Sequence, residues 1–190
     1  MNVLNKIVVQ KADITKLSVD AIVNAANSSL LGGAGVDGCI HRAAGPDLFK
    51  ECKTLGGCET GQSKITKGYK LPAKHIIHTV GPDCRFIEKD VAEELLESCY
   101  TTCLELMKEH ELKTIALCCI STGIYGYPND KASKVAFNTV VEWMDNNPGV
   151  LDQVIFCIFL PKDLELYTDL MAEYERKFED GEKDEVKKEV

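Results

Sequence analysis

The sequence has no apolar segment long enough to cross a membrane. Its longest unbroken apolar run, residues 154–160, is far shorter than the roughly 20 residues that a spanning helix needs. The first residues also lack the apolar core of a secretory signal, because Asn5, Lys6 and Gln10 interrupt them. We therefore expect an intracellular, cytoplasmic protein without membrane contact. A chain of this size can also reach the nucleus by diffusion through pores.

Motifs for disulfides and metal ions are also missing. The nine cysteines are an odd number with no Cys-x-x-Cys pair, and several, such as Cys118 and Cys157, lie inside apolar segments. His75 and His78 are three residues apart in a strand-like segment, so they point to opposite faces and do not favour joint chelation. We therefore predict reduced cysteines and neither a structural metal nor a cofactor.

Positive charge is scarce. The formal net charge is −8, and the arginines are Arg42, Arg85 and Arg176. Non-specific affinity for nucleic acid depends on Lys and Arg that neutralise phosphates, so this charge balance argues against direct nucleic-acid binding. If the protein holds a phosphorylated ligand, backbone amides must make many of the contacts.

The sequence does contain a regular alternation of strand and helix patterns. A length of 190 residues, 45% of them hydrophobic, fits one domain. The patterns predict strands at residues 6–11, 20–24, 63–69, 74–80, 114–120 and 153–160, and helices at residues 36–44, 46–55, 88–110, 129–145 and 164–178. Asn129 or Asp130 is expected to cap the fourth helix. We therefore predict an α/β fold, a three-layer α/β/α sandwich, over residues 1–178. Residues 179–190 are expected to form an acidic, disordered and solvated tail, or a frayed helix end.

A glycine loop between the second strand and its helix is the most informative segment. Residues 24–45 read NAANSSLLGGAGVDGCIHRAAG, so the strand leads into a loop with Gly32, Gly33 and Gly35 and then into a helix. Glycines let backbone N–H groups approach a ligand closely, and a helix start adds unpaired donors and a partial positive charge. The segment favours a phosphate site, although glycines in such a connection also serve simply as turns.

A second loop of small residues follows the apolar run at residues 114–120. Its first five residues are Ser121, Thr122, Gly123, Ile124 and Tyr125. In α/β sandwiches, ligands lie beyond the carboxyl ends of the strands, where such loops are found. If the two strands are neighbours in the sheet, both loops face the same ligand.

Residues 33–38 match the GxGxxG fingerprint of NAD-binding folds, but their context differs. In that fingerprint the first glycine stands in the turn directly after the strand, whereas residues 24–31 intervene in this chain. The acidic residue expected about 20 positions later would be Glu59, which lies among glycines and not at a strand end. An NAD site is therefore the weaker interpretation.

Four ordered segments together resemble the macrodomain family, and most of all its MacroD-type hydrolases. They read IVNAANSSLLGGAGVDGCIHRAAGPD, TGQSKITKGYKLPAKHIIHTVGP, CISTGIYGYPND and VIFCIFL, and the resemblance spans roughly residues 6–178. It implies a mixed six-stranded sheet, mostly parallel and flanked by helices, with ADP-ribose bound in a cleft. It also implies hydrolysis of an ester at the distal ribose, which removes mono-ADP-ribose from Asp and Glu side chains and deacetylates O-acetyl-ADP-ribose.

The resemblance assigns the adenine end of the ligand to Asp13 and the Ile14 backbone. The Asp13 carboxylate would accept a hydrogen bond from the adenine amino group, whereas the residues alone favour an N-cap of a short turn. Phe159 would form an aromatic wall beside the distal ribose, and a core position is the alternative. Phe156 is the fallback for the wall, on the opposite face of the sheet. Ala12 stands where related sequences have glycine.

The diphosphate and the distal ribose would lie between the two loops. The resemblance assigns this contact to the backbone of residues 121–125 and of the first loop, which contributes Gly32, Gly33, Gly35 and Val36. Ala34 replaces one glycine of the usual run of four, and its methyl group is expected to crowd the ribose or stiffen the loop.

Asn27, Asp37 and His41 complete the implied site. Asn27 would bind the ribose hydroxyls, and Asp37 would act on a water molecule as base or orienting group. Asp37 and His41 are four residues apart and share a helix face, so His41 can support the carboxylate. The substrate's own phosphate is the alternative base. From the residues alone, Asp37 is also explained as a first-turn carboxylate and His41 as a half-buried histidine.

A non-catalytic reader of ADP-ribosylated proteins is the alternative function, since the fold and the adenine site would be the same. The presence of Asn27, Asp37 and His41 together favours the hydrolase. The expected partners are ADP-ribose, mono-ADP-ribosylated proteins and O-acetyl-ADP-ribose, and the expected state is a monomer.

Overall fold

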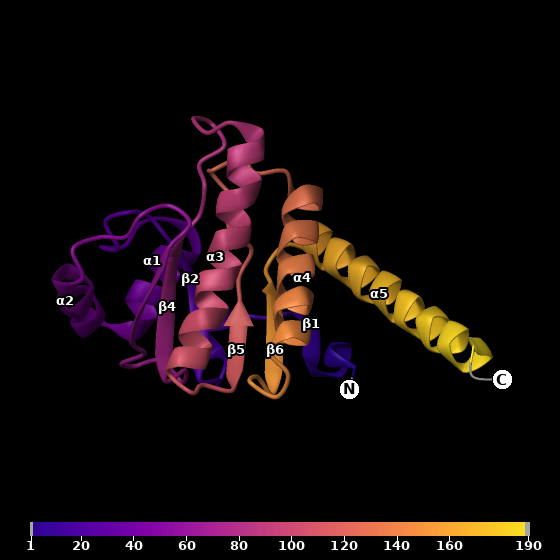
Figure 1. Cartoon of the computed structure of the whole chain (residues 1–190). Helices are drawn as coiled ribbons and strands as arrows, with labels where there is room; N and C mark the ends of the chain where they lie inside the picture. Colours follow the sequence, from indigo (N-terminus) through magenta and orange to yellow (C-terminus); the bar gives the residue numbers. More distant parts are fainter. Residues whose placement is uncertain (1, 189–190) are drawn as a thin grey trace.

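The structure, a computed structural model, describes residues 2–188, with the side chains of residues 2–179. In this part of the chain, six strands form one sheet in the order β1-β6-β5-β2-β4-β3 (Figure 1). They are β1 (Ile7–Lys11), β2 (Ala21–Ala26), β3 (Ser63–Lys67), β4 (His75–Val80), β5 (Thr114–Leu117) and β6 (Gln153–Ile158). All neighbours run parallel except β3, which is antiparallel to β4. The predicted mixed, mostly parallel sheet is confirmed.

The helices lie on both faces of this sheet. They are α1 (Gly35–Ala44), α2 (Pro46–Thr54), α3 (Lys89–Glu109), α4 (Asn129–Asn146) and α5 (Pro161–Lys188), with the short 3₁₀ segments η1 (Val3–Lys6) and η2 (Ile14–Lys16). No helix in the described part of the chain is both long and apolar enough to span a bilayer.

Contacts of the strand side chains assign the helices to two layers. On one face, Asn24 of β2 bonds to α1, and His78 of β4 contacts α2. On the other face, Phe156 of β6 stacks on Phe137 of α4 and contacts Tyr167 of α5. The register pairs Ile22 of β2 with Ala116 of β5, and the next residue of β5, Leu117, with Phe156. Phe156 is therefore level with the residue before Asn24. Successive side chains of a strand point to opposite faces, so Phe156 and Asn24 lie on opposite faces of the sheet. Together with α3, which packs beside α4, these helices form the expected three-layer sandwich.

The core explains the cysteine content. Cys99 and Cys103 of α3 are completely buried, and Cys118 and Cys157 are nearly so. All nine cysteines carry free thiols, and the buried ones pack among leucine, isoleucine and valine side chains as small hydrophobic residues.

Three local predictions differ from the structure. The strand expected at residues 114–120 ends at Leu117, because the chain turns into the second loop. The expected side-chain cap of α4 is wrong: Pro128 is the N-cap, and the Asn129 amide donates to Asp163 Oδ1 at 2.6 Å. The last helix continues past residue 178 to Lys188 and extends away from the sheet (Figure 1). The tail at residues 179–190 stays a prediction, since its side chains from residue 180 lie outside the described residues.

Candidate active site

The two predicted ligand loops leave neighbouring strands. In the sheet, β2 pairs with β5 in parallel, with Ala21 beside Ile115 and Ile22 beside Ala116. The loop at residues 27–34 follows β2, and the loop at residues 118–128 follows β5. Both therefore open at the same edge of the sheet, at the carboxyl ends of adjacent strands, which is where α/β proteins bind ligands.

Both loops contain residues in left-handed backbone conformations. In the first loop, Leu30 has φ of 61° and Gly32 has φ of 91°, and in the second loop Ser121 has φ of 62°. Such conformations are unfavourable for residues other than glycine, and they concentrate at functional sites where the surrounding structure imposes them. Ala34 has φ of −90° and an extended backbone, so its methyl group causes no backbone strain.

Glycines allow the first loop to lie directly on helix α1. A Cβ at Gly38 would lie 2.5 Å from the Gly33 carbonyl oxygen, so only glycine permits this contact. A Cβ at Gly33 would lie 3.0 Å from Asp37 Oδ2 and 3.2 Å from Asn27 Nδ2. Because Gly33 has no side chain, Asp37 Oδ2 and Asn27 Nδ2 lie directly next to the Gly33 backbone.

Asn27 shapes the first loop from the end of β2. Its amide nitrogen donates to the Gly32 carbonyl at 3.0 Å, and its oxygen accepts from the Ser29 backbone at 3.1 Å and from the Ser29 hydroxyl at 2.6 Å. These bonds hold the glycine turn over the first turn of α1. The predicted ribose ligand thus also has a structural task within the loop.

Asp37 and His41 lie together, as their spacing on α1 predicts. Asp37 is only 3% exposed, and its Oδ1 accepts a hydrogen bond from the Asn24 amide at 2.8 Å. His41 Nε2 lies 3.5 Å from the same oxygen. Burial raises the pKa of Asp37, whereas the Asn24 bond and the His41 charge act in the opposite direction. Asp37 Oδ2 and His41 Nε2 are both buried and have no hydrogen-bond partner among the described residues, so each keeps an unused bonding position within the site.

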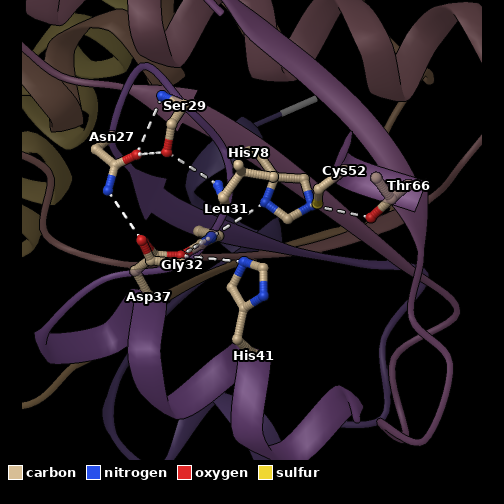
Figure 2. Close-up of polar contacts among 10 residues, drawn as sticks. Asn27, Ser29, Leu31, Gly32, Asp37, His41, Cys52, Thr66 and His78 are labelled. Atoms are coloured by element: carbon tan, nitrogen blue, oxygen red, sulfur yellow. Dashed lines mark hydrogen bonds and ion pairs between the residues drawn. The ribbon is translucent and has the colours of Figure 1, made fainter. Parts of the chain in front are cut away.

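A buried polar network extends from Asp37 into the sheet (Figure 2). The Asn24 amide also contacts His78 Nδ1 at 3.1 Å, and His78 Nε2 contacts the Thr66 hydroxyl at 2.9 Å. Asn24 and Thr66 were not among the predicted site residues. The available signal was a polar residue inside a buried apolar strand, since burying an amide or an imidazole costs free energy unless it has a partner.

His41, Cys52 and His78 place their ligand atoms within 4.8 Å of one another, which raises the question of a metal site. However, both ring nitrogens of His78 already have protein partners. Burial and nearby negative charges also raise the pKa of the Cys52 thiol to about 11, whereas a metal ligand must be the thiolate. We therefore interpret Cys52 and His78 as parts of a hydrogen-bonded network and not as metal ligands.

The predicted adenine residues lie at the far end of the same edge. Asp13 is exposed at the end of β1 and caps η2, where its Oδ1 accepts from the Thr15 backbone at 3.0 Å and from its hydroxyl at 2.6 Å. These bonds, with the Thr15 hydroxyl first, lower the pKa of Asp13. Ile14 beside it is buried. The capping interpretation is therefore correct, and Oδ2 accepts no bond from the described residues.

Phe159 and Phe156 have different roles. Phe159 directly follows β6 and is 80% exposed, so the core alternative for this residue is wrong. Phe156 is the core residue, 1% exposed between Phe137 and Tyr167, and it is not available as an aromatic wall. Because β6 lies between β1 and β5, Phe159 is closer along the sheet to the Asp13 end than to Asp37, which follows β2. The role of Phe159 as an aromatic wall beside the ligand stays a prediction.

The second loop offers backbone groups and one hydroxyl. Gly123 and Ile124 are exposed, and Thr122 and Tyr125 are half-buried. The Tyr125 carbonyl accepts from the Cys84 backbone at 2.9 Å, which ties the loop to the segment after β4. Ser121 Oγ is buried without a partner among the described residues.

The fold and the site define a class: an α/β/α ligand-binding domain with a buried carboxylate–histidine pair beside two loops rich in backbone amides. Residues 23–136 match the family model described as Macro domain. The chain belongs to this family. The NAD-binding interpretation of residues 33–38 is therefore wrong: Gly33 lies near the end of a long loop after β2, and Gly35 and Gly38 belong to helix α1.

Relatives from animals and bacteria are similar over most of the chain. The ADP-ribose glycohydrolase MACROD2 of Xenopus laevis is 57% identical over 169 residues, which are 89% of this chain and 40% of that protein. A macro domain-containing protein of Chlorobaculum tepidum is 57% identical over 162 residues, which are 85% of this chain and 93% of that protein. The chain thus spans less than half the length of MACROD2.

Solved structures of macrodomains share the fold. The Trypanosoma brucei macrodomain in complex with ADP-ribose is 41% identical with a TM-score of 0.84, over 90% of this chain and 71% of that chain. The Oceanobacillus iheyensis macrodomain with ADP is 41% identical with a TM-score of 0.83, over 89% of this chain and 91% of that chain.

The burial of neutral His78 predicts a dependence of stability on pH. Burial, with a smaller effect of the His41 charge, lowers the pKa of His78 to about 3, against about 6.5 in the unfolded chain. The unfolded chain therefore binds a proton that the folded protein excludes, and stability falls as the pH drops from 6.5 towards 3. Relative to a His78→Asn variant, the free energy of unfolding of the wild type should fall by about 3 kcal/mol between pH 7 and pH 4.

Urea unfolding of both proteins at a series of pH values measures this difference. Subtracting the variant removes the contributions of Asp37 and the other carboxylates, which both proteins share. Parallel stability curves would mean that His78 titrates normally in the folded protein.

Proposed function

We propose that this protein binds ADP-ribose and hydrolyses an ester at the distal ribose. In this proposal it removes mono-ADP-ribose from Asp and Glu side chains of proteins and deacetylates O-acetyl-ADP-ribose. The observation that carries the proposal is the buried Asp37, whose unpaired Oδ2 faces the glycine loop next to His41. Similarity to glycohydrolases and to a macrodomain in complex with ADP-ribose supports it.

The order of the strands fits an extended ligand. Asp13, Phe159, Ser121 and Asn27 follow β1, β6, β5 and β2, which are consecutive in the sheet. Three strand spacings, about 14 Å, separate the first from the last. Adenine would lie near Asp13 and the exposed Phe159 ring, the diphosphate near the second loop, and the distal ribose near Asn27. This order gives Phe159 a contact with the adenosine half of the ligand.

The diphosphate contacts would come mainly from the backbone. The start of α1 and the glycines of the first loop present unpaired N–H groups, and the helix adds a partial positive charge. Gly33, Ala34 and Gly35 carry no charged side chain, so the phosphates would meet backbone groups there. An acidic protein can therefore hold two phosphates without a cluster of arginines.

Asp37 would act on the water that cleaves the ester. Water adds a hydroxyl group to one side of the broken C–O bond and a proton to the other, so the products are ADP-ribose and a free carboxylic acid. A carboxylate with a raised pKa is a stronger base than an exposed one, because its pKa lies closer to the working pH. His41 lies close enough to stabilise the charge on Asp37 and to contact the substrate.

Asp37→Asn tests the catalytic role. The amide keeps the size of the side chain but cannot take up a proton, so the rate should fall about 10²–10⁴-fold while ADP-ribose affinity stays within a few-fold. The measurement is loss of label from an Asp/Glu-linked mono-ADP-ribosylated protein, with isothermal titration of ADP-ribose alongside. A nearly full rate in the variant would exclude Asp37 as the base, and tight binding without turnover in the wild type would mean a non-catalytic reader.

Asp13→Asn tests the adenine site separately from the cap. The asparagine oxygen can still cap η2, but its amide nitrogen replaces Oδ2 and cannot accept from the adenine amino group. Losing a charge-assisted hydrogen bond costs about 1.5–3 kcal/mol, so the Kd for ADP-ribose should rise tenfold or more without loss of thermal stability. Ribose 5-phosphate, which lacks adenine, provides the control ligand. An unchanged Kd for ADP-ribose would leave Asp13 with its capping role alone.

A further inference from the structure

We propose that His78 is a positioning residue for Asp37: its neutral ring holds the Asn24 amide in the orientation that donates to the carboxylate. The role in turnover rests on the proposed function, whereas the orientation itself can be tested without it. Asn24, His78 and Thr66 lie on β2, β4 and β3, which are neighbouring strands of the sheet. Figure 2 shows the His78 ring next to Thr66.

A continuous series of contacts joins these residues. The Asn24 amide nitrogen lies 2.8 Å from Asp37 Oδ1 and 3.1 Å from His78 Nδ1. On the other side of the ring, Nε2 lies 2.9 Å from the Thr66 hydroxyl, which donates to the Lys67 carbonyl at 3.2 Å. Asn24 and His78 are completely buried and Thr66 is 2% exposed, so bulk water does not replace these partners.

The two ends of the series determine the direction of every bond in it. An ionised Asp37 and the Lys67 carbonyl can only accept hydrogen bonds. The Thr66 hydrogen is used on Lys67, so Thr66 must accept from His78 Nε2–H. With that nitrogen protonated, a neutral ring leaves Nδ1 as an acceptor for Asn24. Four hydrogens then meet four acceptors, and both amide hydrogens of Asn24 are used.

Any other state of His78 breaks this match. A proton on Nδ1 would face the Asn24 amide hydrogens, so the amide would have to rotate. Its oxygen would then oppose Asp37 Oδ1, and two acceptors would meet without a hydrogen between them. The neutral Nε2–H form of His78 is therefore the one that keeps a donor on the carboxylate.

The charges around Asp37 make the Asn24 bond important. The titratable groups near Asp37 are His41 on its own helix, Cys52 of α2, whose pKa Asp37 raises, and His78 of β4, which is joined to Asp37 through Asn24. Cys52 is a protonated thiol and His78 is neutral, so neither offsets the charge of the carboxylate. Asn24 and His41 remain, and the Asn24 bond opposes the rise in the Asp37 pKa that burial causes. If Asn24 turns away, the pKa of Asp37 rises further and less of it is ionised at neutral pH.

Two substitutions of His78 separate positioning from packing. In His78→Asn the side-chain amide can occupy the place of Nδ1, whereas in His78→Gln it reaches the place of Nε2 and leaves Asn24 without its acceptor. Both variants lose the ring and should lose thermal stability to a similar degree. We expect kcat on the ADP-ribosylated protein to fall about tenfold or more in His78→Gln, with KM and ADP-ribose affinity within twofold. His78→Asn should recover most of that loss.

The pH profile provides a readout that packing alone does not move. In His78→Gln the acid limb of kcat should shift to higher pH, because Asp37 must be ionised and has lost its donor. Equal kcat values and equal acid limbs in the two variants would overturn the proposal. A fall in ADP-ribose affinity that matches the fall in kcat/KM would also overturn it.

A measurement on the ¹⁵N-labelled protein tests the orientation when activity is absent. From pH 5 to pH 9, His78 should keep an unprotonated Nδ1 and a protonated Nε2, and the Asp37 carboxyl should titrate at higher pH in His78→Gln than in the wild type. A protonated Nδ1, or an unchanged Asp37 titration, would overturn the proposal. If the wild type hydrolyses no ester but these signals are as expected, the proposed hydrolase is wrong and the positioning of Asp37 stands.

Discussion

The hydrogen bond from Asn24 to Asp37 is the interaction on which the rest of the site depends. It joins β2 to the first turn of α1 at 2.8 Å, and it supplies a partner to a carboxylate that is almost completely buried. A buried charge without a partner is strongly unfavourable, so the carboxylate can remain beneath the glycine loop only while this amide donates to it. The close contact of Gly38 with the Gly33 backbone brings helix and loop together so that the bond can form.

The same burial links structure to chemistry. Removal of Asp37 from water raises its pKa, which makes it a better base, and its second oxygen lies buried and unpaired next to the bare backbone of Gly33. The left-handed residues Leu30 and Ser121 show that both loops are held in shape by their surroundings. The backbone donors therefore do not have to be ordered when a ligand arrives, which lowers the free-energy cost of binding.

Polar residues occupy buried positions on β2, β4 and the edge strand β3 at a cost in stability. His78, Thr66 and Asn24 replace apolar side chains in the layer between the strands and α2, where well-packed hydrophobic residues are often at least as stabilising. A network of this kind is tolerated when its donors find acceptors, and here each donor from Asn24 to Thr66 has one, while Asn24 Oδ1 accepts no bond among the described residues. Its effect is to give Asp37 one fixed set of neighbours in a core that is otherwise apolar.

The sequence by itself determined the order of the strands and helices, the glycine loops, and the pairing of Asp37 with His41. These features depend on local periodicity and on turn residues, which neighbouring positions express directly. The tertiary structure alone decided the partners from distant segments: Asn24 beside His78, Thr66 on the next strand, Phe159 exposed while Phe156 is buried, and Asn129 bonded to α5 instead of capping α4. Such contacts depend on the tertiary arrangement of strands and helices, which brings together residues that are 12 to 54 positions apart in the chain. No short stretch of sequence encodes that proximity.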